Sequence, residues 1–294
     1  MQVNTTYEPF SQQAEYVQVN LDFLKGLPLS SAGLILDLAC GTGTLAEILL
    51  SINPEACIIG IDISSTSLDI GRRNFSNRGL LVSNQAELYQ RSAQGRGGVF
   101  FIEGSADILP FASDSFDLVM MGNSIHMLPD KQKLLSAIHR VLKPGGLFAF
   151  NSAFFVGTYP AGTEYLYTEW IKSALKYIYD KDEALRLDGK VGITRTRGKG
   201  KKAFNKGWMS ADAWMSLLQQ QNFRVLHNQL RTMQMTQESF ETVGAYAGFA
   251  EVMMSGYSAD IASESLQEGA KLAFKTCGVS AIPRYWLEIA AIKY

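Results

Sequence analysis

The stretch 34–44 places an acid, two glycines and a helix start within eleven residues, a combination suited to binding a polar ligand. An apolar run that contains Asp37 is predicted to be a buried strand. Gly41 and Gly43 follow in a tight turn, and an apolar helical pattern begins at Leu45. Glycine lets a ligand approach the backbone closely, and free N–H groups lie at the start of a helix. We therefore expect a ligand site at this turn, and an adenosine-bearing ligand fits it.

The sign of the charge beside this turn separates two kinds of ligand. Gly41, Gly43 and Ala46 also satisfy the glycine pattern of dinucleotide-binding folds. Asp37 lies four residues before the first glycine, where its carboxylate would repel a pyrophosphate. The same carboxylate suits a cationic ligand, such as the ammonium of an amino-acid moiety. A cationic ligand is thus favoured, and a NAD-binding oxidoreductase stays as an alternative from another class.

The stretch 37–43, Asp-Leu-Ala-Cys-Gly-Thr-Gly, resembles the first motif of the class I S-adenosylmethionine-dependent methyltransferases. In that family the turn wraps the methionine end of the cofactor. The resemblance implies S-adenosyl-L-methionine as cofactor, with four binding residues here: Asp37, Ala39, Gly41 and Gly43.

Two later segments resemble the parts of that family that bind the adenosine. A second apolar run ends at Asp62, about twenty residues after the glycine turn, where an acid can bind both ribose hydroxyls; Ile63 follows it. The segment 100–111 resembles the family's third motif, Gly-Asp-Ala-x-x-Leu-Pro-Phe, which lies against the adenine. Ser105 replaces its usual aspartate, so either Ser105 contacts the ring or Asp107 takes over. We expect Ala106 to line the same loop.

Further resemblance extends to residue 150 and implies the fold. The segment 115–123 resembles the fourth strand and the loop that faces the transferred methyl group, with Asn123 at its end. The segment 141–150 resembles the turn that opens the fifth strand. The implied fold is α/β, a Rossmann-like, doubly wound, seven-stranded sheet with mainly helical cap insertions after the fifth strand and between the sixth and seventh. Those last two strands are expected at 223–226 and 285–292.

Length and composition are consistent with one enzyme domain over residues 1–294. Its segments are an N-terminal helical segment (1–30), a cofactor-binding core (34–150), a helical cap insertion (152–207) and a second helical insertion (236–281). The 27 basic and 28 acidic residues leave a net charge of -1, which gives no general attraction for nucleic acid. The three cysteines and three scattered histidines indicate neither a disulfide framework nor a metal site.

The expected location of the protein follows from two features that are absent from the sequence. No signal peptide and no run of eighteen apolar residues is present, so a cytoplasmic location is expected. Peripheral membrane contact stays open, and the sequence does not set the oligomeric state. The segment 195–202 holds five cations among glycines. It is interpreted either as a solvated loop or as a patch for an acidic lipid surface, a carrier protein or a phosphorylated substrate.

Aromatic residues outside the core are candidates for binding the sulfonium and the acceptor. In similar methyltransferases a leading helix contributes an aromatic residue over the cofactor, and Tyr16 is the choice here, with Tyr7 as the alternative. The first insertion is rich in aromatic residues and follows a strand whose end faces the ligand crevice. It would hold a flat or greasy acceptor with Phe154, Phe155, Tyr159 and Trp170. The opposing interpretation is that all of these aromatic residues pack against a core.

Methyl transfer from a sulfonium requires the nucleophile, methyl and sulfur in line, so much of the acceleration can come from positioning. A base is needed only if the acceptor must lose a proton. His126, just after the fourth strand, is the candidate catalytic residue, and its other interpretation is packing or orientation. The sequence thus predicts methyl transfer to a small, largely apolar or aromatic acceptor, such as a secondary metabolite, quinone or lipid. Oxygen, nitrogen and carbon acceptors all fit, and a carrier-bound or protein substrate is the nearest alternative.

Overall fold

The computed structural model describes residues 3–29, 32–196 and 207–294. The chain forms two compact units. The sheet unit comprises Ala14–Thr158, Gly207–Arg231 and Tyr285–Tyr294, and the helical unit comprises Met1–Gln13, Tyr159–Lys206 and Thr232–Arg284. Segments distant in sequence therefore build each unit.

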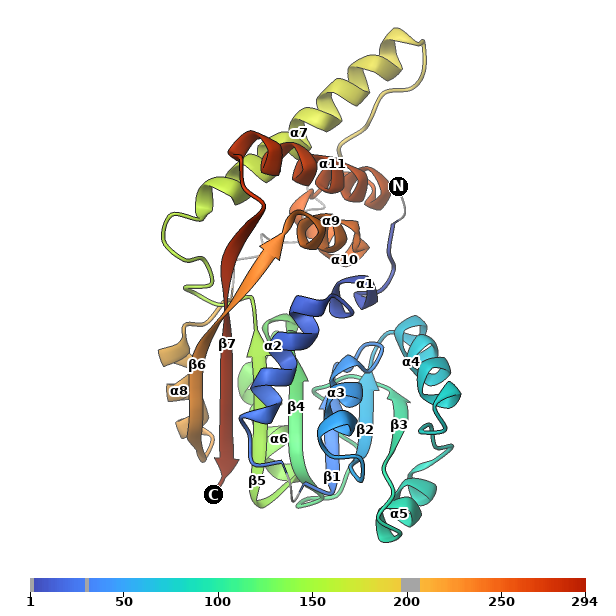
Figure 1. Ribbon diagram of the computed structural model, residues 1–294, viewed down its shortest axis with the longest axis vertical. Helices are drawn as coiled ribbons and strands as arrows, with labels where there is room; N and C mark the ends of the chain where they lie inside the picture. Colours follow the sequence, from blue (N-terminus) through green and yellow to red (C-terminus); the bar gives the residue numbers. More distant parts are fainter. Residues whose placement is uncertain (1–2, 30–31, 197–206) are drawn as a thin grey trace. The chain divides into compact units, whose positions relative to one another are not determined.

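One seven-stranded sheet has the order β3-β2-β1-β4-β5-β7-β6 (Figure 1). Strands β1 to β5 are parallel, and β7 runs antiparallel to β5. This arrangement confirms the predicted doubly wound α/β sheet. The strands are β1 (Leu34–Leu38), β2 (Cys57–Asp62), β3 (Gly98–Glu103), β4 (Phe116–Gly122), β5 (Leu142–Ser152), β6 (Phe223–Thr236) and β7 (Ala281–Lys293).

Helices cover both faces of the parallel strands because alternate strand residues point to opposite sides. Ile35 and Ile58 pack into one apolar cluster with side chains of α2, α3 and α4, whereas Leu36 and Ile59 pack into another with side chains of α5, α6 and α8. The helices of this unit are α2 (Ala14–Lys25), α3 (Thr44–Ile52), α4 (Ser65–Asn77), α5 (Gln85–Ala93), α6 (Lys131–Val141) and α8 (Ala211–Gln220), with a short 3₁₀ helix η1 (Ile125–Met127).

The helical unit contains α1 (Glu8–Ser11), α7 (Glu164–Leu187), α9 (Gln237–Ala245), α10 (Ala247–Met253) and α11 (Ala259–Cys277). The long helices α7 and α11 pack closely along each other (Figure 1). Gly269 permits this approach, because a Cβ there would lie 2.7 Å from the backbone nitrogen of Ala174. The two predicted helical insertions thus pack together.

The last two strands are longer than the sequence predicts. β6 continues from Phe223 to Thr236, and β7 already begins at Ala281. The extension of β6 was missed because much of the strand is exposed and carries charged and polar side chains at many positions. Such a pattern is compatible with an edge strand, which needs less apolar character than a central one.

Candidate active site

The carboxyl ends of β1, β2 and β4 meet where the strand order reverses, with β1 between the other two. In doubly wound sheets this switch point is where ligands bind. Three predicted site residues lie there: Asp37 in β1, Asp62 at the end of β2, and Asn123 directly after β4. The topology therefore brings together residues that the sequence separates by up to 86 positions.

The turn after β1 has the backbone that its glycines predict. Ala39, Gly41 and Gly43 all have positive φ, of 53°, 56° and 91°. A Cβ on Gly43 would lie 2.7 Å from a ring carbon of Phe75 and 3.0 Å from one of Phe101, so only glycine fits without a shift. The turn leads into α3, whose N-cap residue Gly43 makes no side-chain capping hydrogen bond.

Asp62 braces this turn. One of its oxygens accepts the Gly41 N–H at 2.7 Å, and the other accepts the Ser64 N–H at 2.8 Å. A carboxylate oxygen can accept more than one hydrogen bond, so both retain capacity for a ligand hydroxyl. The sequence identified the acid but not its contact with the turn, which depends on the pairing of β1 with β2.

Asp37 is a buried carboxyl to which the described residues donate no hydrogen bond. Its side chain is 1% exposed, and neither oxygen has a hydrogen-bond partner within the described residues. Burial, aided by the nearby charge of Asp62, raises the pKa of Asp37 well above its usual range. An unpartnered buried polar group costs free energy. A cationic ligand group beside Asp37 would remove that cost, so this residue fits the ammonium of S-adenosylmethionine.

Tyr16 lies near Asp37, whereas Tyr7 belongs to the helical unit. Tyr16 projects from α2, is 4% exposed and packs edge-on against Trp286 at 5.4 Å between ring centroids. Burial, and next the charge of Asp37, raise its pKa. Tyr7 packs 5.5 Å from Tyr246. Of the two aromatic candidates, Tyr16 is the one placed beside the acid of the first motif.

The loop after β3 differs from the family pattern at its acid. The Ser105 hydroxyl donates to Asp107, whose other oxygen is 2.9 Å from the Lys133 ammonium. These two contacts, the first being the larger, lower the pKa of Asp107. Ala106 between them is buried. Asp107 is therefore engaged by the protein on both oxygens, and the contact of either residue with adenine stays a prediction.

An exposed apolar side chain follows four of the five parallel strands. Ile63 and Ile108 are 75% and 66% exposed after β2 and β3, and Met127 and Val156 are also exposed after β4 and β5. Large apolar side chains held in water at the carboxyl edge offer a surface for flat, apolar ligand groups. Only Ile63 among them is predicted from the sequence as a site residue. A search for apolar residues in the loops after the strands would have found the other three.

His126 lies in η1, after β4, as the sequence predicts. Its Nδ1 is 3.3 Å from the Ser152 hydroxyl, and its ring centroid is 4.2 Å from that of Phe154. The Lys131 ammonium donates to the His126 carbonyl at 3.2 Å and also to that of Leu128, and burial lowers the pKa of Lys131. Ser152 and Phe154 thus contact the imidazole, while Lys131 binds the backbone of η1.

Comparisons with known proteins agree with this geometry. Residues 36–150 match the family model described as a methyltransferase domain. Over this segment the chain is similar to the class I S-adenosylmethionine-dependent methyltransferases.

Two relatives act in quinone biosynthesis, according to their names. The demethylmenaquinone methyltransferase of Geobacillus kaustophilus is 32% identical over 127 residues, which cover 43% of this chain and 47% of that protein. The ubiquinone/menaquinone biosynthesis C-methyltransferase UbiE of Marinomonas is 33% identical over 113 residues, covering 38% of this chain and 39% of the relative. The chain thus spans less than half the length of the relatives it matches.

A solved structure supports the fold over nearly the whole chain. The crystal structure of a proposed methyltransferase from Bacillus halodurans has a TM-score of 0.53 at 13% identity, and the match covers 94% of this chain and 99% of that one. At this identity the likeness concerns the fold alone.

The four aromatic residues predicted for acceptor binding divide between the two units of the chain. Phe154 packs on His126 and lies 5.7 Å from Trp208, while Phe155 is buried in the sheet-unit core. Tyr159 and Trp170 belong to the helical unit. A role in acceptor binding stays a prediction for all four.

Trp170 has the surroundings of a core residue. Its indole N–H donates to the Leu266 carbonyl at 2.7 Å, and its ring lies 4.7 Å from that of Phe240. Tyr159 instead lies beside Tyr167, with the Arg284 guanidinium 5.4 Å from its centroid. In the basic segment 195–202, residues 197–202 lie outside the described residues, so its proposed docking role stays a prediction.

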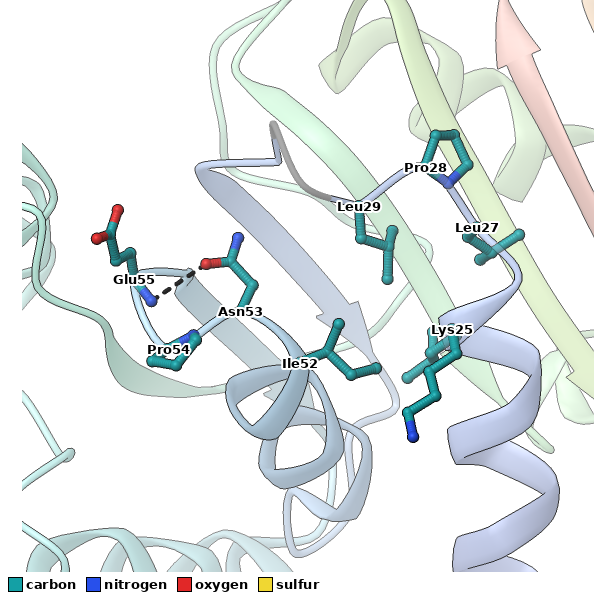
Figure 2. A pocket seen from close by; sticks show the side chains of 9 residues that line it. Lys25, Leu27, Pro28, Leu29, Ile52, Asn53, Pro54 and Glu55 are labelled. Atoms are coloured by element: carbon teal, nitrogen blue, oxygen red, sulfur yellow. Dashed lines mark hydrogen bonds between the residues drawn. The ribbon is translucent and has the colours of Figure 1, made fainter.

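A pocket of about 520 Å³ lies at the opposite edge of the sheet (Figure 2). It is lined by the end of α2, the residues before β1, and the loop between α3 and β2. These segments mark the amino edge of the parallel strands, so the pocket is separate from the candidate active site. Its lining residues are Leu24, Lys25, Leu27, Pro28, Leu29, Ile52, Asn53, Pro54 and Glu55.

Proposed function

We propose that this protein transfers a methyl group from S-adenosyl-L-methionine to a small, largely apolar acceptor. The observation that carries the proposal is the buried Asp37 carboxyl, which lacks a hydrogen-bond partner within the described chain and stands beside the glycine turn. In this proposal Asp37 binds the cofactor ammonium, Asp62 binds the ribose hydroxyls, and Ile63 and Ile108 contact the adenine. The match of residues 36–150 to a methyltransferase domain supports it.

The acceptor proposed is a quinone or a similar lipid-like ring. The names of two relatives refer to quinone methylation, and one specifies a C-methyltransferase. The exposed side chains of Met127 and Val156 on the acceptor-side loops support an apolar partner. Carbon is accordingly the acceptor atom we favour among oxygen, nitrogen and carbon.

We assign two tasks to the chain: it positions the cofactor and the acceptor, and it accepts a proton where the acceptor must lose one. S-adenosylmethionine supplies an activated methyl group on a sulfonium when it is bound. Tyr16 presents a ring to that cation, and Asn123 fixes the loop that faces the methyl group. His126 is placed to accept a proton from an acceptor that must lose one. The Ser152 hydroxyl at its Nδ1 orients the imidazole.

We also propose a cytoplasmic protein that contacts membrane surfaces without spanning them. Tyr179, Leu187 and Val191 are exposed apolar residues at the end of α7 and just after it. Within the described part of the chain, no helix has both the length and the apolar character required to cross a bilayer. Co-sedimentation with anionic and neutral vesicles tests this contact, and absence from both pellets contradicts it.

Calorimetry with S-adenosylmethionine, S-adenosylhomocysteine and NAD tests the cofactor assignment. We expect micromolar binding of the first two, which corresponds to about 8 kcal/mol, and none of NAD. Incubation with labelled cofactor and demethylmenaquinone, followed by mass analysis, tests the acceptor class. Tight NAD binding with no response to S-adenosylmethionine overturns the proposal.

A further inference from the structure

Three buried asparagines connect α2 with the carboxyl ends of β4 and β5. Asn20 on α2 is 0% exposed, Asn151 near the end of β5 is 1% exposed, and Asn123 after β4 is also buried. The Asn151 side-chain NH₂ donates to Asn20 Oδ1 at 2.7 Å, and its own Oδ1 accepts the Asn123 backbone N–H at 3.0 Å. One amide thus joins two segments that approach the site from different directions.

Two further amide groups of the cluster are bonded to the backbone. Asn20 Nδ2 donates to the carbonyl of Tyr16 at 2.8 Å, and Asn123 Oδ1 accepts the N–H of Ala153 at 2.8 Å. Asn123 itself has a positive φ of 46°, a conformation that asparagine tolerates better than most residues. Buried amides are costly unless paired, so these four bonds favour one arrangement of the three side chains.

We propose that Asn151 is a positioning residue that fixes the cofactor side of the site relative to the methyl-facing side. The inference rests on the proposed function. Through its bond to Asn20, Asn151 fixes the position of α2. It therefore also fixes the position of Tyr16, which lies one turn earlier and beside Asp37. Through the Asn123 N–H, it sets the loop after β4.

The next residue extends this arrangement to the candidate base. Ser152 follows Asn151 directly, and its hydroxyl is 3.3 Å from His126 Nδ1. A shift of β5 at Asn151 would therefore move the hydroxyl that orients the imidazole. The cofactor, the methyl-facing loop and the base all depend on this strand end.

α2 has a second attachment, so removing the amide contact should leave the fold intact. Asp22 on α2 lies 3.9 Å from Arg231, which is paired with the buried Glu288 of β7. This attachment lies within the sheet unit and does not involve Asn20 or Asn151. Variants of Asn20 and Asn151 therefore test the position of α2 in a protein that still folds.

The experiment uses the full chain with Asn20→Ala, Asn151→Ala and both together. Calorimetry without acceptor measures S-adenosylmethionine affinity, and steady-state assays measure kcat and KM. We expect Asn20→Ala to weaken cofactor affinity about threefold to tenfold, consistent with the loss of one buried hydrogen bond. Asn151→Ala should weaken it at least as much and also lower kcat, because the loop after β4 loses its side-chain anchor and keeps only the bond from the Asn123 N–H to the Asn151 backbone carbonyl, at 3.1 Å. Adding Asn20→Ala to Asn151→Ala should change little further, since both remove the same bond.

Asn53→Ala is the matched control. Asn53 Oδ1 accepts the Glu55 N–H at 3.2 Å and its Nδ2 donates to the Ala32 carbonyl at 3.4 Å, at the amino edge of the sheet (Figure 2). This variant should keep wild-type affinity and kcat.

Three results overturn the inference while the proposed function stands: wild-type affinity and kcat in both single variants, a loss of melting temperature alone, or independent effects that add in the double variant. If Asn151→Ala does not fold, Asn20→Ala and its control decide the question by the same affinity measurement. Failure of the wild-type protein to bind S-adenosylmethionine would instead refute the proposed function, and the inference with it.

Discussion

Two deeply buried polar side chains, Trp170 in the helical unit and Asp37 in the sheet unit, have different surroundings. In the helical unit the buried Trp170 indole N–H is bonded to the Leu266 carbonyl at 2.7 Å. In the sheet unit Asp37 is as deeply buried, yet neither of its oxygens has a hydrogen-bond partner among the described residues. A buried carboxyl without a hydrogen bond requires an explanation, and at the glycine turn a cationic ligand group supplies one.

The comparison also separates two uses of aromatic residues. Trp170 and Phe240 fill the interior of the helical unit, while Tyr16 stands next to a buried acid. Packing in a core therefore explains Trp170, in the first insertion, better than it explains Tyr16, in the N-terminal segment. The expected outcomes that follow test this division.

The largest effect is expected at the helical core. Trp170→Ala should lower the free energy of unfolding by about 3–5 kcal/mol, because it empties a large buried volume. Affinity for S-adenosylmethionine should stay at the wild-type value. Denaturant unfolding and calorimetry on the same sample measure both quantities. A variant of normal stability that fails only in turnover with acceptor would return Trp170 to the acceptor site.

The second effect concerns the acid of the first motif. Asp37→Asn should weaken S-adenosylmethionine binding by about 2–5 kcal/mol, since a buried charge pair loses one partner. The ligand-free protein should become more stable, because a neutral amide is less costly to bury than a carboxyl that can ionise. Calorimetry checks the expected loss of affinity, and thermal melting of the ligand-free protein checks the expected gain in stability. Weaker binding together with lower ligand-free stability would mean that Asp37 supports the fold instead.

A smaller effect is expected at Asp62. Asp62→Ala should weaken cofactor binding by about 1.5–3 kcal/mol through loss of the charged acceptor to the ribose hydroxyls. Because Asp62 also accepts the Gly41 N–H, part of the loss could come from the turn. An S-adenosylmethionine analogue without the ribose hydroxyls distinguishes the two: wild type and variant should bind it equally. A variant that still binds this analogue more weakly than wild type acts through the turn.

The smallest effect is a pH dependence with opposite signs for binding and stability. The pKa of Asp37 is raised in the ligand-free protein, so the folded state retains a proton that the unfolded chain releases above about 3.8. Ligand-free stability from this group therefore falls as pH rises from that value toward the folded pKa, by at most about 1.4 kcal/mol per pH unit. Cofactor affinity should rise over the same window, because the bound cation favours the ionised carboxyl.

Proton release on binding checks this mechanism. Calorimetry in two buffers of different ionisation enthalpy should give different apparent binding enthalpies for the wild type. Asp37→Asn serves as the control and should remove that difference. An equal proton release in the variant would assign the titration to another group.

Local sequence identified the cofactor side of the site because its backbone geometry is local. The positive φ values at Gly41 and Gly43 and the helix that follows are fixed by adjacent residues, and Asp62 was located by its distance along a βαβ unit. The acceptor side was harder to predict. The sequence gives no way to rank its four candidates, which are Phe154, Phe155, Tyr159 and Trp170. In the structure they belong to two different units, and Tyr159 lies beside another aromatic ring, that of Tyr167.

The sequence by itself determined the order of strands and helices, the glycine turn and the acids that lie near it, since hydrophobic periodicity and turn chemistry act over a few residues. Only the tertiary structure decided that Asp37 is buried without a hydrogen-bond partner in the described chain, that Asp62 supports the turn, and that Asn20 meets Asn151 across 131 positions. Burial and hydrogen-bond pairing depend on which distant segments the fold brings together, and no local pattern encodes that choice.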